Sequence, residues 1–553
     1  MLSETKLRQF LTPKLVDIYD DHIPDFVHTF SCGEGNVCEV LREEVNYWNC
    51  RDPVQIDAPT GRGKTSFVYE VLIPRAIERG KNVLLISNRV AVSVQQKIKI
   101  MELLGSPLIG CLTNKGIQQQ ESFGMVRVIT YHRLPALLKE ERNKQWIENL
   151  IYVVADEVHF FAADSSFNEN CDYYLKLITS KFQHAIRVYL TATIWDVLHP
   201  LVEAEKNNYR DYDIVASPYT VYQRGLYRYR FSGNYRYILL NFFDDLEEIK
   251  PLILQKPDDK WLIFVSSKQE GQTFVANLNS DDQGASAKKR AAYLDADKKD
   301  TDEWRNLLSS SMFETQVLVA TSVLDCGINI WDDALKNIVI IADNRTSLLQ
   351  MLGRKRCKPS ERINLYVRDI SRQTFASRHK EGMSLFSWYR RYKNADREEQ
   401  KRIATEIWRK ADPVLLNYFR LGGGSLYPNE LAFFSLGRKL RFYEQFISED
   451  ATATFQNAVR EWLGMAVEHS PDYRDALASF CLQHKDTEMV ESEIAEFRKL
   501  VICACEQNGY KEPQPKRKDF LRIGALNNRL AKLDMPFELE EKQWVIHAKE
   551  DTE

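Results

Sequence analysis

The sequence predicts an α/β protein with two parallel-sheet lobes in tandem, followed by a mostly helical C-terminal domain. Between Val54 and Val367, short β-branched runs alternate with amphipathic stretches, which is the pattern of βαβ units. The runs form two series, separated by the tyrosine-rich segment Tyr219–Tyr237. After about Arg372 the strand signal fades, and apolar residues recur at the three- and four-residue spacing of helices.

Each series supplies five expected strands. Those of the first lobe are Val54–Ala58, Val83–Ser87, Val126–Thr130, Ile151–Ala155 and Ile186–Leu190. Those of the second lobe are Trp261–Val265, Ala291–Leu294, Val317–Thr321, Ile338–Ala342 and Ile363–Val367. The tyrosine-rich segment and the helical-looking stretch Phe242–Gln255 connect the series, so we place the lobe boundary near Arg224. The expected domains are an N-terminal helical extension over 1–45, lobe 1 over 46–223, lobe 2 over 224–372 and a helical accessory domain over 373–553.

In the C-terminal third, Arg397–Lys410 and Ser492–Cys505 are expected to be helices. The run Gly422–Gly424 before Pro428 follows no expected strand, and predicts a loop between helices rather than a phosphate-binding loop. Residues 511–533 hold seven basic and two acidic residues, whereas residues 534–553 hold two basic and seven acidic ones. These segments either neutralise each other across a helical pair or include a nucleic-acid clamp.

Composition excludes several classes of protein. A chain of 553 residues is too long for one ordinary core, and 44 % hydrophobic with 28 % charged residues is typical of globular proteins. The net charge of −3 confines any nucleic-acid surface to local patches. Ten scattered cysteines without paired CxxC spacing indicate reduced thiols rather than a zinc site. Without a signal peptide or membrane-spanning run in the sequence, we expect a cytoplasmic protein with no membrane partner.

The strongest motif is Ala58–Thr65, with the sequence APTGRGKT, between the first expected strand and the amphipathic segment Ser66–Arg79. A strand, a glycine-rich turn and a helix are the context of a P-loop, whose N–H groups surround the phosphates of ATP or GTP. A chance glycine-lysine turn is the alternative. In a P-loop, Lys64 bridges the β- and γ-phosphates and Thr65 ligates Mg²⁺. The expected nucleotide-binding residues are Thr60, Gly61, Arg62, Gly63, Lys64 and Thr65.

A second motif, Asp156-Glu157-Val158-His159, ends an apolar strand with two adjacent carboxylates. Strand ends are where ligands of parallel sheets bind. We expect Asp156 to hold Mg²⁺ through its water shell, and Glu157 to orient and deprotonate the attacking water. Standing alone, the motif would be read as an acidic loop with a solvated histidine, but the P-loop in the same lobe favours the catalytic interpretation.

A third motif, Gln350-Met351-Leu352-Gly353-Arg354-Lys355-Arg356, follows an expected strand of the second lobe. Arginines directed at a γ-phosphate stabilise the charge that develops in the transition state. The candidate catalytic residues in this motif are therefore Gln350, Arg354 and Arg356. An ordinary solvated basic helix is the alternative.

Together these motifs resemble superfamily 2 helicases, specifically the DExH-box group, over roughly Val54 to Arg356 and in the expected order. The resemblance implies two RecA-like lobes and a nucleic-acid-stimulated ATPase that uses ATP and Mg²⁺. It implies DNA or RNA as partner, bound along a single-stranded tract. Nucleic-acid or coupling roles are implied for Asn88, Arg89, Thr130, Tyr131, His159, Thr191, Thr193, Ser266 and Thr321, and a nucleotide contact for Gly327.

One position departs from the family pattern. The sixth motif of the family usually reads QxxGRxxR, and its last arginine is replaced here by Cys357, so we expect Arg356 to take that role from one position earlier. The implied mechanism is closure of the lobes over ATP, with arginines supplied by the second lobe. Each lobe contacts the phosphodiester backbone at a separate point. Alternating closure and opening of the lobes then moves one contact relative to the other along a single strand.

Two other functions stay open. One is a translocase subunit of a restriction, repair or defence assembly, with a protein partner such as a nuclease. The other is a nucleotide-gated nucleic-acid clamp with weak hydrolysis, motivated by Cys357. Near the first strand, Tyr47 and Trp48 either stack on adenine or belong to the core, and core aromatics are the commoner case.

Overall fold

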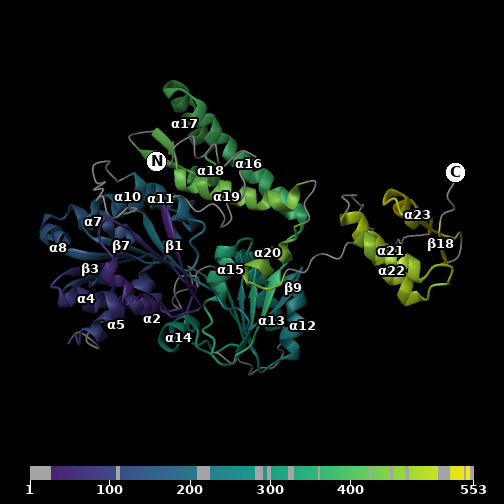
Figure 1. The fold of residues 1–553 in the computed structure, drawn as a ribbon, viewed down its shortest axis with the longest axis horizontal. Coiled ribbons are helices and arrows are strands. Elements are labelled where there is room, and N and C mark those ends of the chain that lie inside the picture. Colours follow the sequence, from purple (N-terminus) through teal and green to yellow (C-terminus); the bar gives the residue numbers. More distant parts are fainter. Residues whose placement is uncertain are drawn as a thin grey trace, which may run out of the picture. The chain divides into compact units, whose positions relative to one another are not determined.

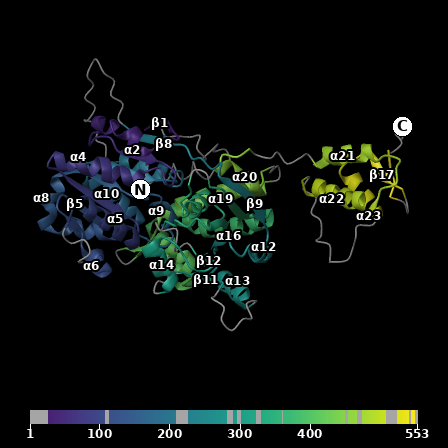
Figure 2. The ribbon, with the colours of Figure 1, turned by 90° about the horizontal axis from the view of Figure 1, so that it is seen from below.

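The computed structural model describes residues 26–106, 113–207, 225–280, 290–295, 301–321, 329–358, 361–422, 425–448, 453–466, 473–507, 523–540 and 544–548. The chain divides into two compact units, Met1–Glu444 and Gln445–Glu553. The first unit contains two large β-sheets, which lie side by side in Figures 1 and 2. The predicted fold class, with two α/β lobes in tandem and a mostly helical C-terminal region, is confirmed.

Lobe 1 is built on an eight-stranded sheet of order β1-β8-β2-β7-β6-β3-β5-β4. All neighbouring strands are parallel except β4 and β5. The strands are β1 (Val27–Gly33), β2 (Val54–Asp57), β3 (Asn82–Ser87), β4 (Ser122–Phe123), β5 (Val126–Thr130), β6 (Leu150–Ala155), β7 (Ile186–Thr191) and β8 (Leu226–Phe231). All five strands predicted for this lobe are present, because their apolar runs are buried on both faces of the sheet.

Successive residues of the central strands face two separate hydrophobic cores. In β3, Val83 and Leu85 join one core, whereas Leu84 and Ile86 join the other. The cores are closed by helices α2 (Val37–Leu41), α3 (Lys64–Phe67), α4 (Ile73–Glu78), α5 (Val90–Leu103), α6 (Asn114–Gln119), α7 (Leu134–Lys139), α8 (Lys144–Glu148), α9 (Phe160–Ala163), α10 (Cys171–Lys181) and α11 (Leu198–Lys206). Shorter helical turns are Glu44–Tyr47, Tyr131–Arg133, Glu141–Asn143 and the π-helical Val68–Leu72, which joins α3 to α4.

Strands β1 and β8 correct the expected lobe boundary. β8 lies in the tyrosine-rich segment taken as a connection, yet it pairs with β1 and β2, so lobe 1 extends past Arg224 to Phe231. β1 and α2 fall within 1–45, the expected helical extension, but belong to the sheet and core of lobe 1. The sequence of β8 did not predict a buried strand because it contains Arg228. This arginine is buried, and Asp57 on β2 compensates its charge at a distance of 2.5 Å.

Lobe 2 is a six-stranded parallel sheet of order β11-β12-β10-β13-β14-β9. Its strands are β9 (Ile238–Phe243), β10 (Lys260–Phe264), β11 (Ala291–Leu294), β12 (Val317–Ala320), β13 (Leu335–Ile340) and β14 (Ile363–Arg368). Its helices are α12 (Ile249–Gln255), α13 (Lys268–Ser280), α14 (Asp302–Ser310) and α15 (Arg345–Leu352), with a 3₁₀ turn at Leu246–Glu248. Each predicted strand overlaps an observed one. The stretch expected to be helical from Phe242 begins instead as the end of β9, an edge strand.

A helical segment follows lobe 2 and gathers on one side of the two lobes in Figure 1. It consists of α16 (Arg372–Asn394), α17 (Arg397–Lys410), α18 (Pro413–Asn417) and α19 (Glu430–Ile447) around an aromatic core. The helix predicted at Arg397–Lys410 is confirmed. The glycine run was expected between helices, but it follows β15 (Phe419–Gly422), which pairs antiparallel with β16 (Ser425–Pro428). Gly423 and Gly424 lie outside the described residues.

The second unit contains α20 (Phe455–Trp462), α21 (Tyr473–Gln483), α22 (Glu491–Gln507), α23 (Ile523–Lys532), β17 (Phe537–Leu539) and β18 (Ile546–Ala548). Helices α21 to α23 and the β17-β18 hairpin share one hydrophobic core. The helix predicted at Ser492–Cys505 lies within α22. Much of the basic segment 511–533 falls outside the described residues. Within the described ranges, no helix combines the length and apolar character needed to cross a bilayer.

Candidate functional site

The motifs of lobe 1 line one edge of its sheet. Strands β2, β7, β6, β3 and β5 are parallel neighbours in this order, so their carboxyl ends meet at the same edge. The segments that follow these strands begin, respectively, with the P-loop, Ala192, Asp156, Asn88 and Tyr131. The nucleotide candidates therefore cluster on the β2 side of the edge, and the nucleic-acid candidates follow toward β5.

The P-loop leaves β2 and enters a helix that begins at Lys64. Gly61 and Gly63 have φ angles of +85° and +84°, a left-handed conformation that glycine adopts without strain. The ammonium group of Lys64 is buried and donates hydrogen bonds to the carbonyls of Ala58 at 2.5 Å and Pro59 at 3.2 Å. Because burial disfavours its charge, the pKa of Lys64 is lowered. A bound phosphate would give this ammonium group an anionic partner.

Asp156 is held by donors on both carboxylate oxygens. Gln96 on α5 donates from Nε2 to Oδ2 at 2.8 Å, and the backbone N–H of Glu157 donates to Oδ1 at 3.0 Å. The hydroxyl of Tyr131 donates to the Asp156 carbonyl at 2.8 Å. Glu157 has φ of +52°, which costs energy for a residue other than glycine and is found preferentially at functional sites.

The two carboxylates have opposite pKa shifts. Burial and the adjacent Glu157 raise the pKa of Asp156, while Lys64 opposes this shift. Burial would also raise the pKa of Glu157, but His159, Lys64 and Arg354 together lower it below its usual range. Glu157 is therefore ionised at neutral pH, as a general base must be. A divalent cation near Asp156 would favour its ionised form.

A continuous polar path joins lobe 2 to Glu157. Arg354 donates from Nη2 to Gln350 Oε1 at 2.8 Å, and Gln350 donates from Nε2 to Thr193 Oγ1 in lobe 1 at 3.4 Å. The N–H of Thr193 donates to Thr191 Oγ1 at 3.0 Å. His159 Nδ1 lies 3.3 Å from that oxygen and 3.2 Å from Glu157 Oε2. All members of the path except Glu157 are buried.

Gly353 and Arg356 bring the second lobe against the P-loop. A Cβ on Gly353 would approach Thr60 Oγ1 to 2.2 Å, so the contact requires glycine. Arg356 Nη1 lies 3.2 Å from where a Cβ on Gly61 would be. Its Nε donates to Asn329 Oδ1 at 2.8 Å. The neighbouring arginine at 354 points instead along the polar path, so the two guanidinium groups occupy different places.

A cavity of about 630 Å³ lies between these elements. Arg62 and Cys357 line it from opposite lobes, and Tyr235 and Tyr237 line it from the connection between the lobes. Arg62 donates to the carbonyls of Glu34 at 2.5 Å and Ser232 at 3.3 Å, which fixes it on the lobe 1 side. The cavity and the P-loop together hold the ammonium groups of Lys64, Lys355 and Lys358 and several guanidinium groups, with the carboxylate pair beside them. This set fits a nucleoside triphosphate with Mg²⁺.

The nucleic-acid candidates lie further along the sheet edges. Asn88 is nearly buried, and its Oδ1 has no hydrogen-bond partner among the described residues. Arg89 forms an ion pair with Asp164 at 2.7 Å. In lobe 2, Ser266 is exposed and Thr321 is partly exposed beyond the ends of β10 and β12, which are neighbours. The structure thus places one such group in each lobe.

Two candidates stand apart. Tyr131 was expected to have a nucleic-acid or coupling role; it is fully buried, with its ring stacked on Phe160 at 5.0 Å between centroids, which leaves no surface for nucleic acid. Its aromatic ring completes a core, so it acts on the site only through its bond to the Asp156 backbone. Gly327, expected to contact the nucleotide, lies outside the described residues.

Neither aromatic residue considered for adenine lines the cavity. Trp48 packs edge-on against Phe67 and donates from Nε1 to Tyr229 OH at 3.1 Å, as a core residue does. Tyr47 is 79 % exposed. Sequence reasoning also missed Asn36, whose side chain lies 2.9 Å from where a Cβ on Gly63 would be, because an asparagine beside a short helix carries no recognisable signal.

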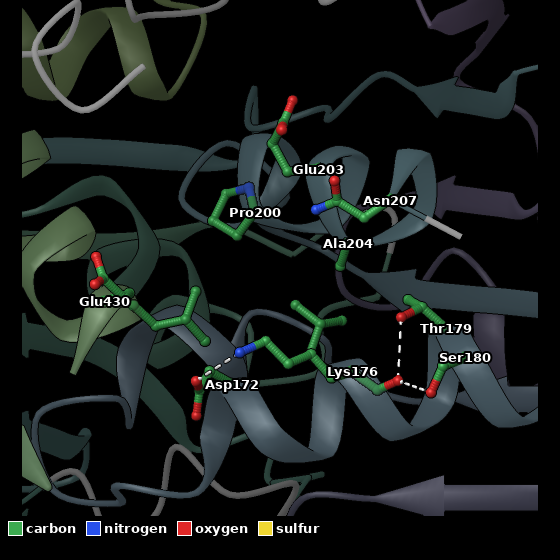
Figure 3. Close-up of a pocket in the computed structure, with 11 residues that line it drawn as sticks. Asp172, Lys176, Thr179, Ser180, Pro200, Glu203, Ala204, Asn207 and Glu430 are labelled. Carbon is green, nitrogen blue, oxygen red and sulfur yellow. Dashed lines mark hydrogen bonds and ion pairs between the residues drawn. The ribbon is translucent and has the colours of Figure 1, made fainter. Parts of the chain in front are cut away.

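A second cavity, of about 350 Å³, lies between α10, α11 and the start of α19 (Figure 3). Its charged side chains already have partners within the protein. Asp172 accepts hydrogen bonds from Lys176 at 3.1 Å and from Arg420 at 2.9 and 2.8 Å. Glu430 accepts from Tyr389 at 2.7 Å and pairs with Lys393 at 2.5 Å. None of the candidate site residues lines this cavity.

Comparison with known proteins finds matches to two family models, one in each lobe. Residues 34–196 match the family model described as type III restriction enzyme, res subunit, and residues 244–357 match the one described as helicase conserved C-terminal domain. The two matches, in this order on one chain, support a superfamily 2 helicase and imply an ATP-hydrolysing enzyme. No curated protein matches the sequence.

Similar solved structures share little sequence with the chain. One is S. cerevisiae Dbp5 bound to RNA and ADP BeF3, at 15 % identity over 57 % of this chain and 79 % of that one, with a TM-score of 0.39. Another is the DUF1998 helicase MrfA bound to DNA, at 14 % identity over 73 % and 58 %, with a TM-score of 0.44. A third is Mycobacterium smegmatis helicase Lhr bound to ssDNA and AMP-PNP, at 13 % identity over 93 % and 58 %, with a TM-score of 0.42. The chain thus spans 58 % of the length of the last two.

Proposed function

We propose that this helicase-domain protein is a DExH-type motor that couples ATP hydrolysis to movement along, or unwinding of, DNA or RNA. The observation that carries the proposal is the polar path from Arg354 through Gln350 to Glu157. Two of its members belong to lobe 2 and the others to lobe 1, so the path exists only while the lobes are in contact. Catalysis that depends on lobe closure is what a motor needs, because closure can then also move a bound strand.

Each site residue has a role that its position supports. ATP with Mg²⁺ supplies the phosphoanhydride bond and a divalent charge that neutralises the phosphate oxygens. Lys64 and Thr65, at the start of the helix, would hold the phosphates and the metal, and Asp156 would be a further residue that holds the metal. Glu157, being ionised, accepts the proton of the attacking water.

The two lobe 2 arginines have separate roles in this proposal. Arg356, next to the P-loop, offsets charge that develops on the phosphate oxygens, and so takes the role of the arginine missing at Cys357. Arg354 orients Gln350 and thereby connects closure to the carboxylates. This arrangement weakens the case for a clamp with poor hydrolysis, which was motivated by Cys357 alone.

Nucleic acid is assigned to the segments at the carboxyl ends of strands in both lobes. Asn88, Arg89 and Thr130 in lobe 1, with Ser266 and Thr321 in lobe 2, would contact the phosphodiester backbone. Such contacts position a strand without reading its sequence, so we expect little sequence preference from the two lobes.

The test is steady-state ATP hydrolysis by the full chain, alone and with single-stranded or duplex DNA or RNA. Lys64→Ala serves as the blank, because it removes the buried ammonium group. Stimulation of the wild-type rate by a polymer is the expected result. If the chain binds ATP and hydrolyses it at the same rate with every polymer, the motor assignment is wrong.

A translocase subunit of a restriction, repair or defence assembly is the second candidate. This candidate is favoured by the family model that residues 34–196 match, because that family is described as the res subunit of type III restriction enzymes. Among the described residues, no three His, Cys, Asp or Glu side chains gather as a metal site that would serve a nuclease. A strand-displacement assay separates the candidates, since a pure translocase hydrolyses ATP on duplex DNA without separating the strands.

A further inference from the structure

Helix α17 presents a basic face that has no part in the nucleotide site. Its apolar residues, Ile403, Ala404 and Ile407, are buried against the core of the helical segment. The outer face forms a shallow groove of about 520 Å³. This α17 groove is lined by Lys401, Arg402, Thr405, Glu406, Arg409 and Lys410. Figure 1 shows α17 at the outer end of the helical segment.

Most of the positive charge in the groove is not compensated. Glu406 is engaged by Arg391 of α16 at 3.0 Å, and Arg402 is within 3.5 Å of Glu399. Lys401 and Arg409 are both exposed and have no ion-pair partner among the described residues. In a chain whose net charge is −3, such a concentration of cations marks a local site for an anionic partner.

Two tryptophans belong to the same pair of helices as these cations: Trp388 contacts some of them, and Trp408 directly precedes Arg409 in the sequence, outside the lining of the groove. The ring of Trp388 on α16 has Lys410 Nζ at 4.4 Å and the Arg391 guanidinium at 4.8 Å from its centroid. Trp408 on α17 is 60 % exposed, although a side chain of this size is usually covered. Proteins bind single-stranded nucleic acid by combining cations, which contact the phosphate backbone, with aromatic rings, on which bases stack.

We propose that the α17 groove is an additional binding surface for a single nucleic-acid strand, outside the two lobes. Lys401 and Arg409 contact its phosphates, and Trp408 stacks on one base. This inference rests on the proposed function, because the strand is the one on which the motor acts. Neither contact reads base identity, so the surface adds affinity and length dependence without sequence preference.

The experiment compares the full-length protein with two variants in binding to fluorescent single strands of increasing length, over a range of salt concentrations. In Lys401→Ala/Arg409→Ala, the slope of log affinity against log salt should fall in magnitude by about 1.4, which is about 0.7 for each phosphate that is no longer neutralised. Trp408→Ala should weaken binding by about tenfold, the order expected for one stacked base. ATP hydrolysis without nucleic acid should be unchanged in both variants.

The control is Lys181→Ala/Lys256→Ala, which removes two exposed lysines from the two lobes. If the groove variants match this control in affinity, salt slope and length dependence, the inference is wrong, and the groove is left for a protein partner. This outcome is distinct from failure of the proposed function, in which the wild-type protein itself shows no binding and no stimulated hydrolysis. Rescue of the salt slope by Lys401→Arg/Arg409→Lys would support the charge assignment.

Discussion

At the scale of single residues, the position of Asp156 depends on Gln96. Two buried side chains meet at 2.8 Å, and Gln96 belongs to α5, the helix that starts directly after Asn88 and Arg89. The group proposed to contact nucleic acid at the start of α5, and the group that holds the carboxylate proposed to bind the metal, thus belong to one helix. We therefore propose that a strand bound to lobe 1 acts on the ATPase site through α5.

Replacing Gln96 with leucine tests this connection. Gln96→Leu removes the donor and leaves a buried carboxylate oxygen unpaired, which costs about 1.5–3 kcal/mol for a hydrogen bond to a charged group. We expect a lower kcat, a higher Mg²⁺ requirement and weaker stimulation by nucleic acid. Gln95→Leu is the matched control, because Gln95 is exposed on the same helix. Equal Mg²⁺ titrations for both variants would show that Asp156 does not need this donor.

Substitution of Gly353 should impair contact between the lobes rather than the position of Asp156. A methyl group at this position would lie 2.2 Å from Thr60 Oγ1, so Gly353→Ala should hold the lobes apart. ATP should still bind to lobe 1, while turnover falls by at least tenfold. Gly437→Ala, where the nearest atom would be 3.8 Å away, is the control and should be tolerated. Nucleotide binding followed by fluorescence, together with kcat, separates the two effects; normal turnover by Gly353→Ala would mean that this contact is not part of the cycle.

The sequence predicts the residues that we propose to carry the chemistry, but it does not predict those that hold them in place. Lys64, Glu157 and Arg354 belong to short motifs in which residue type and spacing are tied to a reaction. Gln96 lies within an ordinary helix and Asn36 beside a short one, so only the packing of distant segments reveals their contacts. Burial cannot be read from a motif either, so the sequence did not reveal that Tyr131 reaches the site from inside the core.

At the scale of elements, α19 and the residues just before it form hydrogen bonds with both lobes. Asn429, just before this helix, donates to the carbonyl of Ser165 at 2.7 Å, and Ser435 donates to that of Ala162 at 3.1 Å, both shortly after the carboxylate motif. One helical turn beyond the middle of α19, Tyr443 donates to Asp343 in lobe 2 at 2.8 Å. The helical segment therefore holds the lobe 1 edge that carries Glu157.

Removing the hydrogen bond of Asn429 should weaken the packing of the helical segment against lobe 1. Asn429 is buried, so Asn429→Ala leaves the Ser165 carbonyl without its donor, at a cost of about 1–3 kcal/mol. We expect a lower Tm and earlier proteolysis near α19. Asn417→Ala, at an exposed position of α18, is the control. If thermal unfolding of the two variants coincides, Asn429 does not contribute to the junction.

Elements with uniform apolar runs were predictable, and those with mixed runs were not. β3 and β7 are buried along their whole length, and each has an apolar centre, Val83–Ile86 in β3 and Val188–Leu190 in β7, from which the strand could be predicted. β8 alternates tyrosine and arginine, and its place beside β2 depends on the ion pair of Arg228 with Asp57, 171 positions away. The β15-β16 hairpin was missed because its strands are short and lie among helices.

At the scale of the whole first unit, the lobes are joined by several contacts that converge near Thr193. Trp195 donates to Thr346 at 3.2 Å and lies under the Arg345 guanidinium, 3.8 Å from the ring centroid. Asp196 accepts a hydrogen bond from Thr346 and lies 3.7 Å from Arg438 of α19. Opening of the lobes would break these contacts together with the polar path, so we propose that the segment after β7 responds to closure at several points.

Gln350 is the position at which closure and chemistry can be separated. Gln350→Leu keeps the volume of the side chain but removes its bonds to Thr193 and Arg354. Because the P-loop lies wholly in lobe 1, the KM for ATP should change little, while kcat with nucleic acid should fall by tenfold or more. Gln373→Leu, on the exposed face of α16, is the control.

A double-mutant cycle with Thr193→Val should give a coupling energy of about 0.5–3 kcal/mol, as for residues in contact. Strictly additive effects would mean that Gln350 and Thr193 act independently, and then the contact across the lobes would not be the route by which closure reaches Glu157.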